Sequence, residues 1–180
     1  MPVEGEKKTV ILGFVGQYAH GNEPSHHVAY LFPYAGCSWR TAEIVRKVCA
    51  EQYVNKPDGL TGNDDCGQMS AWYIFSAMGF YPVNPCADGY VFGAPQLPEM
   101  IVDVGYGRTF KIVAKNLSKT NLYVKSIRLN GKKFGGIKIR HEDISAGGEL
   151  VYEMADRKQE IACKKVMGEF RFQPPPSFFR

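Results

Sequence analysis

The sequence lacks a continuous apolar run of the roughly 20 residues that a membrane-spanning helix needs. Its first residues, MPVEGEKKTVILGFVG, also lack the features of a signal peptide. The apolar stretch there is short, follows acidic and basic residues, and contains no small-residue cleavage site. The sequence therefore predicts neither a membrane span nor a secretion signal in this chain.

Cysteine motifs for metal or redox chemistry are absent as well. The cysteines are odd in number, and no two of them have CxxC spacing: Cys37, Cys49, Cys66, Cys86 and Cys163. This pattern disfavours a tetrahedral zinc site and a thioredoxin-like centre. We interpret the cysteines as buried free thiols, although a single disulfide stays open for an exported protein.

The sequence has little excess charge of either sign. It carries 22 Lys and Arg against 18 Asp and Glu, and the basic residues form isolated pairs such as Lys132–Lys133. A nucleic-acid-binding protein more often gathers its basic residues on one face. The 44% hydrophobic content and the abundant Phe and Tyr predict a folded globular chain instead.

The first half of the chain, up to about Pro85, has the spacing of helices. Ser25 can cap a helix over His26–Leu31, and a second helix should begin at Ser38 or Thr41. In the second, apolar residues recur at helical intervals: Ile44, Val45, Val48, Cys49 and Tyr53. A third helix, Cys66–Met78, is apolar nearly all round and should be buried, with Gly79 ending it.

The second half alternates as β-strands do. We expect a helical turn at 141–144, a hairpin at Asn130-Gly131, and the strands Tyr90–Phe92, Glu99–Val104, Thr109–Ala114, Val124–Leu129 and Glu149–Met154. The predicted fold class is α+β, with an antiparallel β unit. We divide the chain into a helical portion (1–85), a β unit (86–155) and an irregular tail (156–180).

One polar cluster lies where the pattern predicts burial, directly before the apolar third helix. It contains Asn63, Asp64 and Asp65, with Gln68 following. A carboxylate at a helix start is stabilised in its ionised form by free backbone N–H groups and can deprotonate water. The alternative is structural: one Asp caps the helix and the other is exposed.

A second polar cluster, HGNEPSHH, places Asn22, Glu23, His26 and His27 around one turn. Adjacent histidines on a helix point about 100° apart, so a transition-metal site is disfavoured. Hydrogen bonding to a polyhydroxylated ligand is the preferred interpretation, and packed polar groups are the alternative, above all for His27. Several aromatic residues lie near both clusters: Tyr18, Tyr30, Trp39, Trp72 and Tyr73. They could stack on sugar rings or belong to the core, and for Trp72 we prefer the core.

The longer segments around these clusters, GQYAHGNEPSHHVAYLFPYAG and PDGLTGNDDCGQMSAWYIFSAMGFYPV, resemble glycoside hydrolase family 92. YVFGAPQLPEMIVDVGYGRTFKIVAKN and SIRLNGKKF also resemble the C-terminal strands of that family. The resemblance covers roughly Gly13 to Met154. It implies the last helices of an (α/α)6 barrel followed by a β-sandwich-like unit, so we expect the C-terminal part of a longer protein.

The resemblance also implies an activity: exo-acting, inverting hydrolysis of α-mannosides such as those of N-glycans, with calcium as cofactor. It makes Asp65 the general base, with Asp64 or Asn63 assisting, and Glu23 a substrate contact. We add Asn22, His26, His27 and Gln68 as substrate-binding candidates and leave the metal ligands open. By the same resemblance, the parent protein is secreted or lies in the cell envelope, as in the periplasm.

No segment of this sequence resembles the family's general acid, which lies upstream in the family. Inversion needs an acid and a base. We therefore expect the isolated chain to be nearly inactive, and its partners to be the N-terminal portion of the enzyme and an α-mannoside glycan. Uncovered apolar helix faces should also favour self-association. The alternatives are a non-catalytic carbohydrate-binding module and a purely structural domain, which binding measurements would distinguish.

Overall fold

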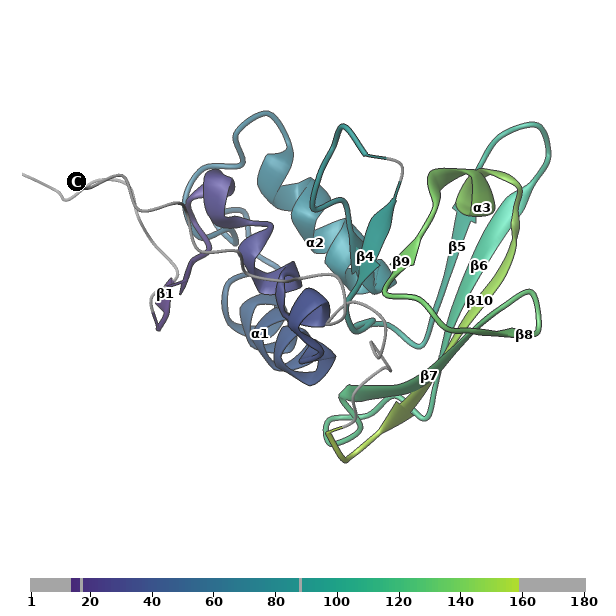
Figure 1. The fold of residues 1–180 in the computed structure, drawn as a ribbon. Helices are drawn as coiled ribbons and strands as arrows, with labels where there is room; N and C mark the ends of the chain where they lie inside the picture. The colour runs from purple at the N-terminus through teal and green to yellow at the C-terminus, as the bar shows by residue number, and fades with distance from the viewer. Residues whose placement is uncertain (1–13, 17, 88, 159–180) are drawn as a thin grey trace, which may run out of the picture.

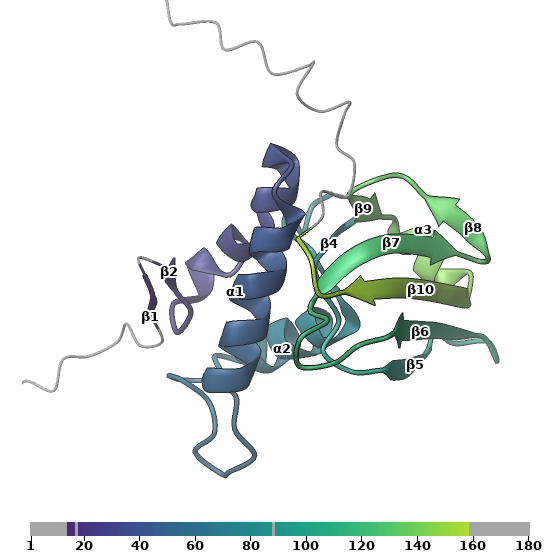
Figure 2. The same cartoon turned by 90° about the horizontal axis from the view of Figure 1, so that it is seen from below.

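The structure, a computed structural model, describes residues 14–16, 18–87 and 89–158. Helices gather on one side of the molecule, and a five-stranded sheet forms the other (Figure 2). The two long helices are α1 (Ser38–Glu51) and α2 (Gln68–Met78), which lie beside each other in Figure 1. The shorter helical elements are the 3-10 turns η1 (Glu23–Ser25), η2 (Val28–Tyr30) and η3 (Phe32–Ala35), and the one-turn helix α3 (His141–Ser145).

The main sheet has the strand order β5–β6–β10–β7–β8. Its strands are β5 (Glu99–Asp103), β6 (Thr109–Lys115), β7 (Tyr123–Leu129), β8 (Lys132–Phe134) and β10 (Gly148–Ala155). A smaller sheet joins β3 (Phe80–Tyr81), β4 (Tyr90–Phe92) and β9 (Lys138–Ile139), while β1 (Phe14–Val15) pairs with β2 (Tyr18–Ala19). The expected α+β class is thus confirmed.

The β unit is mixed, which corrects the expectation of a purely antiparallel one. β10 pairs antiparallel with β7 but parallel with β6, where Leu150 lies opposite Ile112. The reason is topological. The chain passes through β7, β8, β9 and α3 before β10 returns to the gap between β6 and β7. A strand in that gap must run along one neighbour and against the other, because β6 and β7 themselves run in opposite directions.

The expected helix over His26–Leu31 is wrong in type. The chain there forms the short turn η2, with η1 before it and η3 after it, and the Ser25 hydroxyl does not cap a helix. It lies within hydrogen-bond distance of the carbonyl oxygens of Ala19 and Asn22. Pro33, which follows this segment in η3, has no N–H to donate to a preceding turn of helix, so an α-helix over the segment could not continue through it. The segment therefore stays a series of tight turns.

The other local predictions hold with small shifts. α1 begins at Ser38, one of the two predicted starts, and α2 begins at Gln68, two residues later than expected. Gly79 ends α2 with φ 92°, and Asn130 and Gly131 both have positive φ in the β7–β8 hairpin, as a type I′ turn requires. The predicted helical turn is α3.

The core consists of two clusters that share α1 and α2. One lies against the main sheet and includes Phe110, Tyr152 and Met78. The other surrounds Trp72 and Tyr30, neither of which has any exposed surface. Trp72 is therefore a core residue, as preferred from the sequence. Among the described residues, no helix is both long and apolar enough to span a bilayer.

Candidate functional site

The backbone before α2 is unusual, because Asp65, Cys66 and Gly67 all have positive φ, at 49°, 58° and 91°. Few residues other than Gly, Asn and Asp adopt this conformation readily. The consequence is a tight reversal just before the first turn of α2. This turn separates the two neighbouring aspartates and gives them different surroundings.

Asp64 caps α2 from outside the helix. Its Oδ1 accepts hydrogen bonds from the backbone N–H and the hydroxyl of Ser70, each at 2.9 Å. The Ser70 amide lies in the first turn of α2, where backbone N–H groups have no partner within the helix. Asp64 is therefore the aspartate that caps the helix, a choice that the sequence left open.

Asp65 is exposed and faces the second polar cluster instead. Its carboxyl group lies close to that of Glu23: a hydrogen bond from the protonated form of Asp65 to Glu23, and then the charge of Glu23, raise the pKa of Asp65 above its ordinary value. Two carboxyl groups from separate parts of the sequence thus lie side by side. We call Glu23 and Asp65 the carboxylate pair.

Glu23 begins η1, in a turn held by backbone hydrogen bonds. The Ser25 N–H donates to the Asn22 carbonyl at 2.9 Å, and the His26 N–H donates to the Glu23 carbonyl at 3.0 Å. Asn22 and Glu23 are partly exposed at this turn, whereas His27 is exposed. The turn therefore places Glu23 beside Asp65. It also leaves His27 exposed, whereas His26 is buried.

His26 is buried, and both of its ring nitrogens have protein partners. Nε2 lies 2.9 Å from the His20 carbonyl oxygen, which can only accept, so Nε2 carries the proton. Nδ1 then accepts from the Gln68 amide nitrogen at 3.0 Å. Burial lowers the pKa of His26, in keeping with a neutral ring. His26 therefore has no ring nitrogen left for a ligand and instead holds Gln68.

Gln68 is the first residue of α2 and uses its amide nitrogen twice. Besides His26, this nitrogen donates to the Tyr81 hydroxyl at 3.2 Å. The amide carbonyl oxygen is the atom left to accept from a ligand. Among the other predicted site residues, Asn63 is exposed and lies at the loop before Asp64.

Sequence reasoning missed His20, Tyr53 and the supporting role of Trp72. His20 has no exposed surface and bonds Tyr18 through Nδ1 at 2.9 Å and Tyr53 through Nε2 at 2.6 Å. The Trp72 indole N–H donates to the His26 carbonyl at 3.1 Å. A signal for His20 existed, since it opens the polar cluster HGNEPSHH, but nothing in the sequence distinguishes it from a surface histidine.

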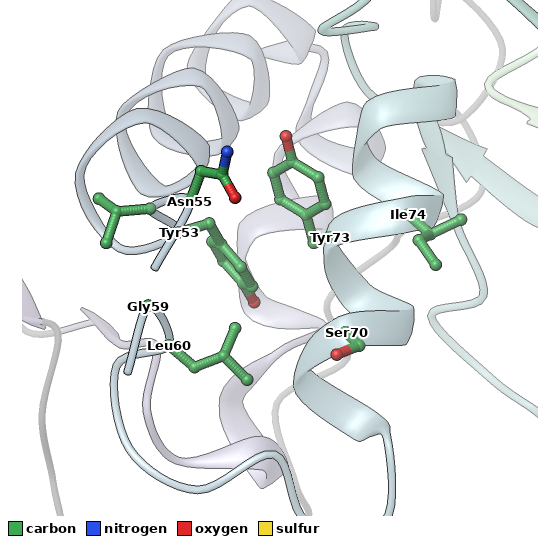
Figure 3. Close-up of a pocket in the computed structure, with 8 residues that line it drawn as sticks. Tyr53, Asn55, Gly59, Leu60, Ser70, Tyr73 and Ile74 are labelled. Carbon is green, nitrogen blue, oxygen red and sulfur yellow. The ribbon is translucent and has the colours of Figure 1, made fainter. Parts of the chain in front are cut away.

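A hollow of about 400 Å³ lies beside the site (Figure 3). It is lined by Tyr53, Val54, Asn55, Gly59, Leu60, Ser70, Tyr73 and Ile74. Ser70 connects it to Asp64, but neither member of the carboxylate pair lines it. The candidate reactive groups, the carboxylate pair, therefore lie at the exposed turn before α2. The hollow is a separate, largely apolar feature.

Within residues 14–16, 18–87 and 89–158, no three His, Cys, Asp or Glu side chains converge as a metal site would require. The cysteines in these ranges are free thiols, but only Cys49 is buried, so the prediction of buried thiols holds for one of them. Cys66 and Cys86 are exposed, and Cys37 is partly exposed. Cys163 lies outside the described residues.

A family model described as the glycosyl hydrolase family 92 catalytic domain matches residues 3–156. This chain belongs to glycosyl hydrolase family 92. The match includes both polar clusters, the carboxylate pair and the whole five-stranded sheet, so the resemblance expected from the sequence is confirmed.

Family 92 structures share this chain's fold. The α-mannosidase BT3965 from Bacteroides thetaiotaomicron, solved in complex with mannoimidazole, is 42% identical with a TM-score of 0.81, covering 87% of this chain and 21% of that one. The inverting mannosidase BT2199 from the same organism is 38% identical with a TM-score of 0.73, covering 79% of this chain and 19% of that one.

A curated relative, an uncharacterized secreted glycosidase of Arthroderma benhamiae, is 30% identical over 133 residues. The aligned region is 72% of this chain but 17% of that protein. This chain therefore spans about a fifth of the length of these three proteins.

Proposed function

We propose that this chain supplies the general-base side of the active site of an inverting exo-α-mannosidase of family 92. The observation that carries the proposal is the carboxylate pair, in which Asp65 is exposed, unused by the helix and next to Glu23. The names of the two solved relatives, an α-mannosidase and an inverting mannosidase, support the substrate class and the stereochemistry.

In this proposal Asp65 takes a proton from the water that attacks the sugar. A hydrogen bond from protonated Asp65 to Glu23, and then the negative charge of Glu23, raise the pKa of Asp65, which makes its carboxylate a stronger base. Asp64 assists by fixing the backbone, because its Oδ1 is held by Ser70. Asn63 stands next to Asp64 as the second assisting candidate. Substrate hydroxyls would be met by Asn22, Glu23, His27 and the Gln68 carbonyl oxygen, with His26 holding Gln68 in place.

Glu23 does not suit the role of general acid. The acid and base of an inverting glycosidase are separated by about 6.5 to 9.5 Å, to leave room for water. Protonated Asp65 would hydrogen-bond directly to Glu23, so these two carboxyl groups are far too close to be the acid and the base. We therefore propose that the acid comes from another part of the whole enzyme, where α1 and α2 would be the last helices of an (α/α)6 barrel. This chain alone should bind an α-mannoside without hydrolysing it.

Calcium and cellular location stay proposals for the whole protein. Calcium takes six to eight oxygen ligands. Among the described residues no three His, Cys, Asp or Glu side chains converge, so backbone or amide oxygens, or other parts of the enzyme, would have to complete such a site. Metal analysis of the whole purified enzyme would test for calcium. The name of the secreted relative supports export, which fractionation of the producing cells would test.

The test of the proposal is Asp65→Asn in the whole enzyme. Asn tolerates the positive φ of position 65 and keeps the shape of the side chain, but cannot take the proton. The rate on an α-mannoside should fall by roughly a hundred- to ten-thousand-fold, with little change in melting temperature. Glu51→Gln is the matched control, because Glu51 is an exposed carboxylate that is paired only with Lys47 on α1. A near-normal rate for Asp65→Asn would contradict the proposal.

A further inference from the structure

When both carboxylates are ionised, the carboxylate pair is electrostatically unfavourable and must be held together by the rest of the fold. Like charges in contact repel, and this repulsion contributes to the raised pKa of Asp65. Both groups are at least partly exposed, so packing around them is limited. The force that holds them together therefore comes from the segments that carry them: the turn at Glu23 and the backbone that leads into α2.

Buried and partly buried hydrogen bonds connect these two segments, and the partners of each bond fix its direction. The Tyr53 hydroxyl donates to the Met69 carbonyl at 3.0 Å, so it accepts from His20 Nε2. Nε2 therefore carries the His20 proton, and Nδ1 accepts from the Tyr18 hydroxyl. The path runs from Tyr18 through His20 and Tyr53 to Met69, the second residue of α2.

The same histidine also closes the turn that carries Glu23. Its carbonyl oxygen accepts the Nε2 proton of His26, and His26 in turn accepts from Gln68. The first turn of α2 is thus bonded to the Glu23 turn twice, through Gln68 and through Met69. His20 takes part in both connections, one through its ring and one through its backbone.

We propose that His20 is a positioning residue that holds Glu23 and Asp65 together by joining the Glu23 turn to the first turn of α2. Its catalytic meaning rests on the proposed function, but its structural effect does not. His20 needs one donor and one acceptor in a site without solvent, which is the neutral form of imidazole. The edge of its ring also packs on Trp72, with centroids 4.2 Å apart.

The pKa of Asp65, followed by carboxyl carbon NMR on this chain, reports whether the pair is intact. His20→Phe keeps a ring of similar size but removes both ring hydrogen bonds, and Tyr53→Phe removes only the hydroxyl that links His20 to Met69. In both variants the pair should separate, and the Asp65 midpoint should shift down toward the ordinary value of an aspartate.

The matched control is Tyr152→Phe. The Tyr152 hydroxyl is also buried and also donates to a backbone carbonyl, that of Gly79 at 2.9 Å, but at the opposite end of α2. This variant should lose stability while the Asp65 midpoint stays unchanged. If His20→Phe does not fold, Tyr53→Phe decides the question. An unchanged Asp65 midpoint in Tyr53→Phe, or an equal shift in Tyr152→Phe, would overturn the inference.

The measurement contains no mannoside, so it separates this inference from the proposed function. A downward shift in the His20 and Tyr53 variants supports positioning even if the whole enzyme has another substrate. Conversely, a loss of turnover in Asp65→Asn without any shift in these variants would keep the proposed base and reject the role of His20.

Discussion

At the scale of single residues, the backbone before α2 gives two neighbouring aspartates different surroundings: Asp64 caps the helix, and Asp65 is exposed beside Glu23. Asp64→Ala should lower the free energy of unfolding by about 1 to 2 kcal/mol, because it leaves the Ser70 amide without its partner. Asp65→Asn should leave stability unchanged or raise it, because it removes a repulsion from Glu23. Urea unfolding of both variants checks this, and a larger loss for Asp65→Asn would show that the assignment is reversed.

The buried histidines predict how stability depends on pH. Burial lowers the pKa of His20 to about 3, with a further contribution from His26, whose own pKa is also lowered. As the pH falls below about 6.5, the unfolded chain binds protons that the folded chain does not. The contribution of the buried neutral histidines to the free energy of unfolding is therefore complete above that pH and decreases below it. Each histidine should lower the free energy of unfolding by up to about 1.4 kcal/mol for each pH unit below that value.

Urea unfolding at about pH 7 and about pH 5 measures this loss. The raised pKa of Asp65 acts in the opposite direction, but only near the lower, acidic range where carboxyl groups titrate. His20→Phe serves as the control, because removing one of the two buried histidines should make the loss shallower. Equal stability at both pH values in the unmodified protein would contradict the prediction.

At the scale of elements, the end of α2 depends on Gly79. Its φ is 92°, and a Cβ there would lie 2.9 Å from the Tyr152 hydroxyl and 3.0 Å from Pro95. Gly79→Ala should therefore add a packing clash to the backbone cost and lower stability by about 2 to 4 kcal/mol in total. Gly36→Ala is the control, with φ 76° and open space around its Cβ, and should lose only about 1 kcal/mol. Similar losses in chemical denaturation would argue against the clash.

Helices and strands whose formation depends on their own residues could be predicted from the sequence. Features that depend on contacts between distant parts of the chain could not. Phe110 and Ile112 alternate with more exposed neighbours, so the strand that contains them could be recognised from sequence. The parallel pairing of β10 with β6 depends on the path of the whole chain and has no local signal.

The same distinction explains the candidate site. Both polar clusters were visible in the sequence, but the positive φ that separates Asp64 from Asp65 was not. The 3-10 turns decide that His26 is buried and His27 exposed, whereas from the sequence a packed polar group was the alternative above all for His27. The hydrogen bond that joins His20 to Tyr53 spans 33 positions and could not be foreseen.

At the scale of the whole molecule, apolar side chains remain uncovered next to the candidate site. Ile74 on α2 is 53% exposed and Val54 is 50% exposed, and both line the hollow in Figure 3. This agrees with the expectation that the nearly all-apolar helix would leave an uncovered face, and neighbouring apolar groups of this kind favour association. The chain should therefore self-associate through the hollow.

Ile74→Lys should weaken that association, because burying one aliphatic side chain contributes about 1.5 to 3 kcal/mol, or roughly ten- to a hundredfold in the association constant. Light scattering over a dilution series measures it. Ile101→Lys is the control: Ile101 is more exposed, at 62%, but lies on the edge strand β5, outside the hollow. If Ile101→Lys dissociates the protein and Ile74→Lys does not, pairing of sheet edges drives association instead. A chain that is monomeric without any substitution would reject both routes, because neither surface would then attract a partner copy.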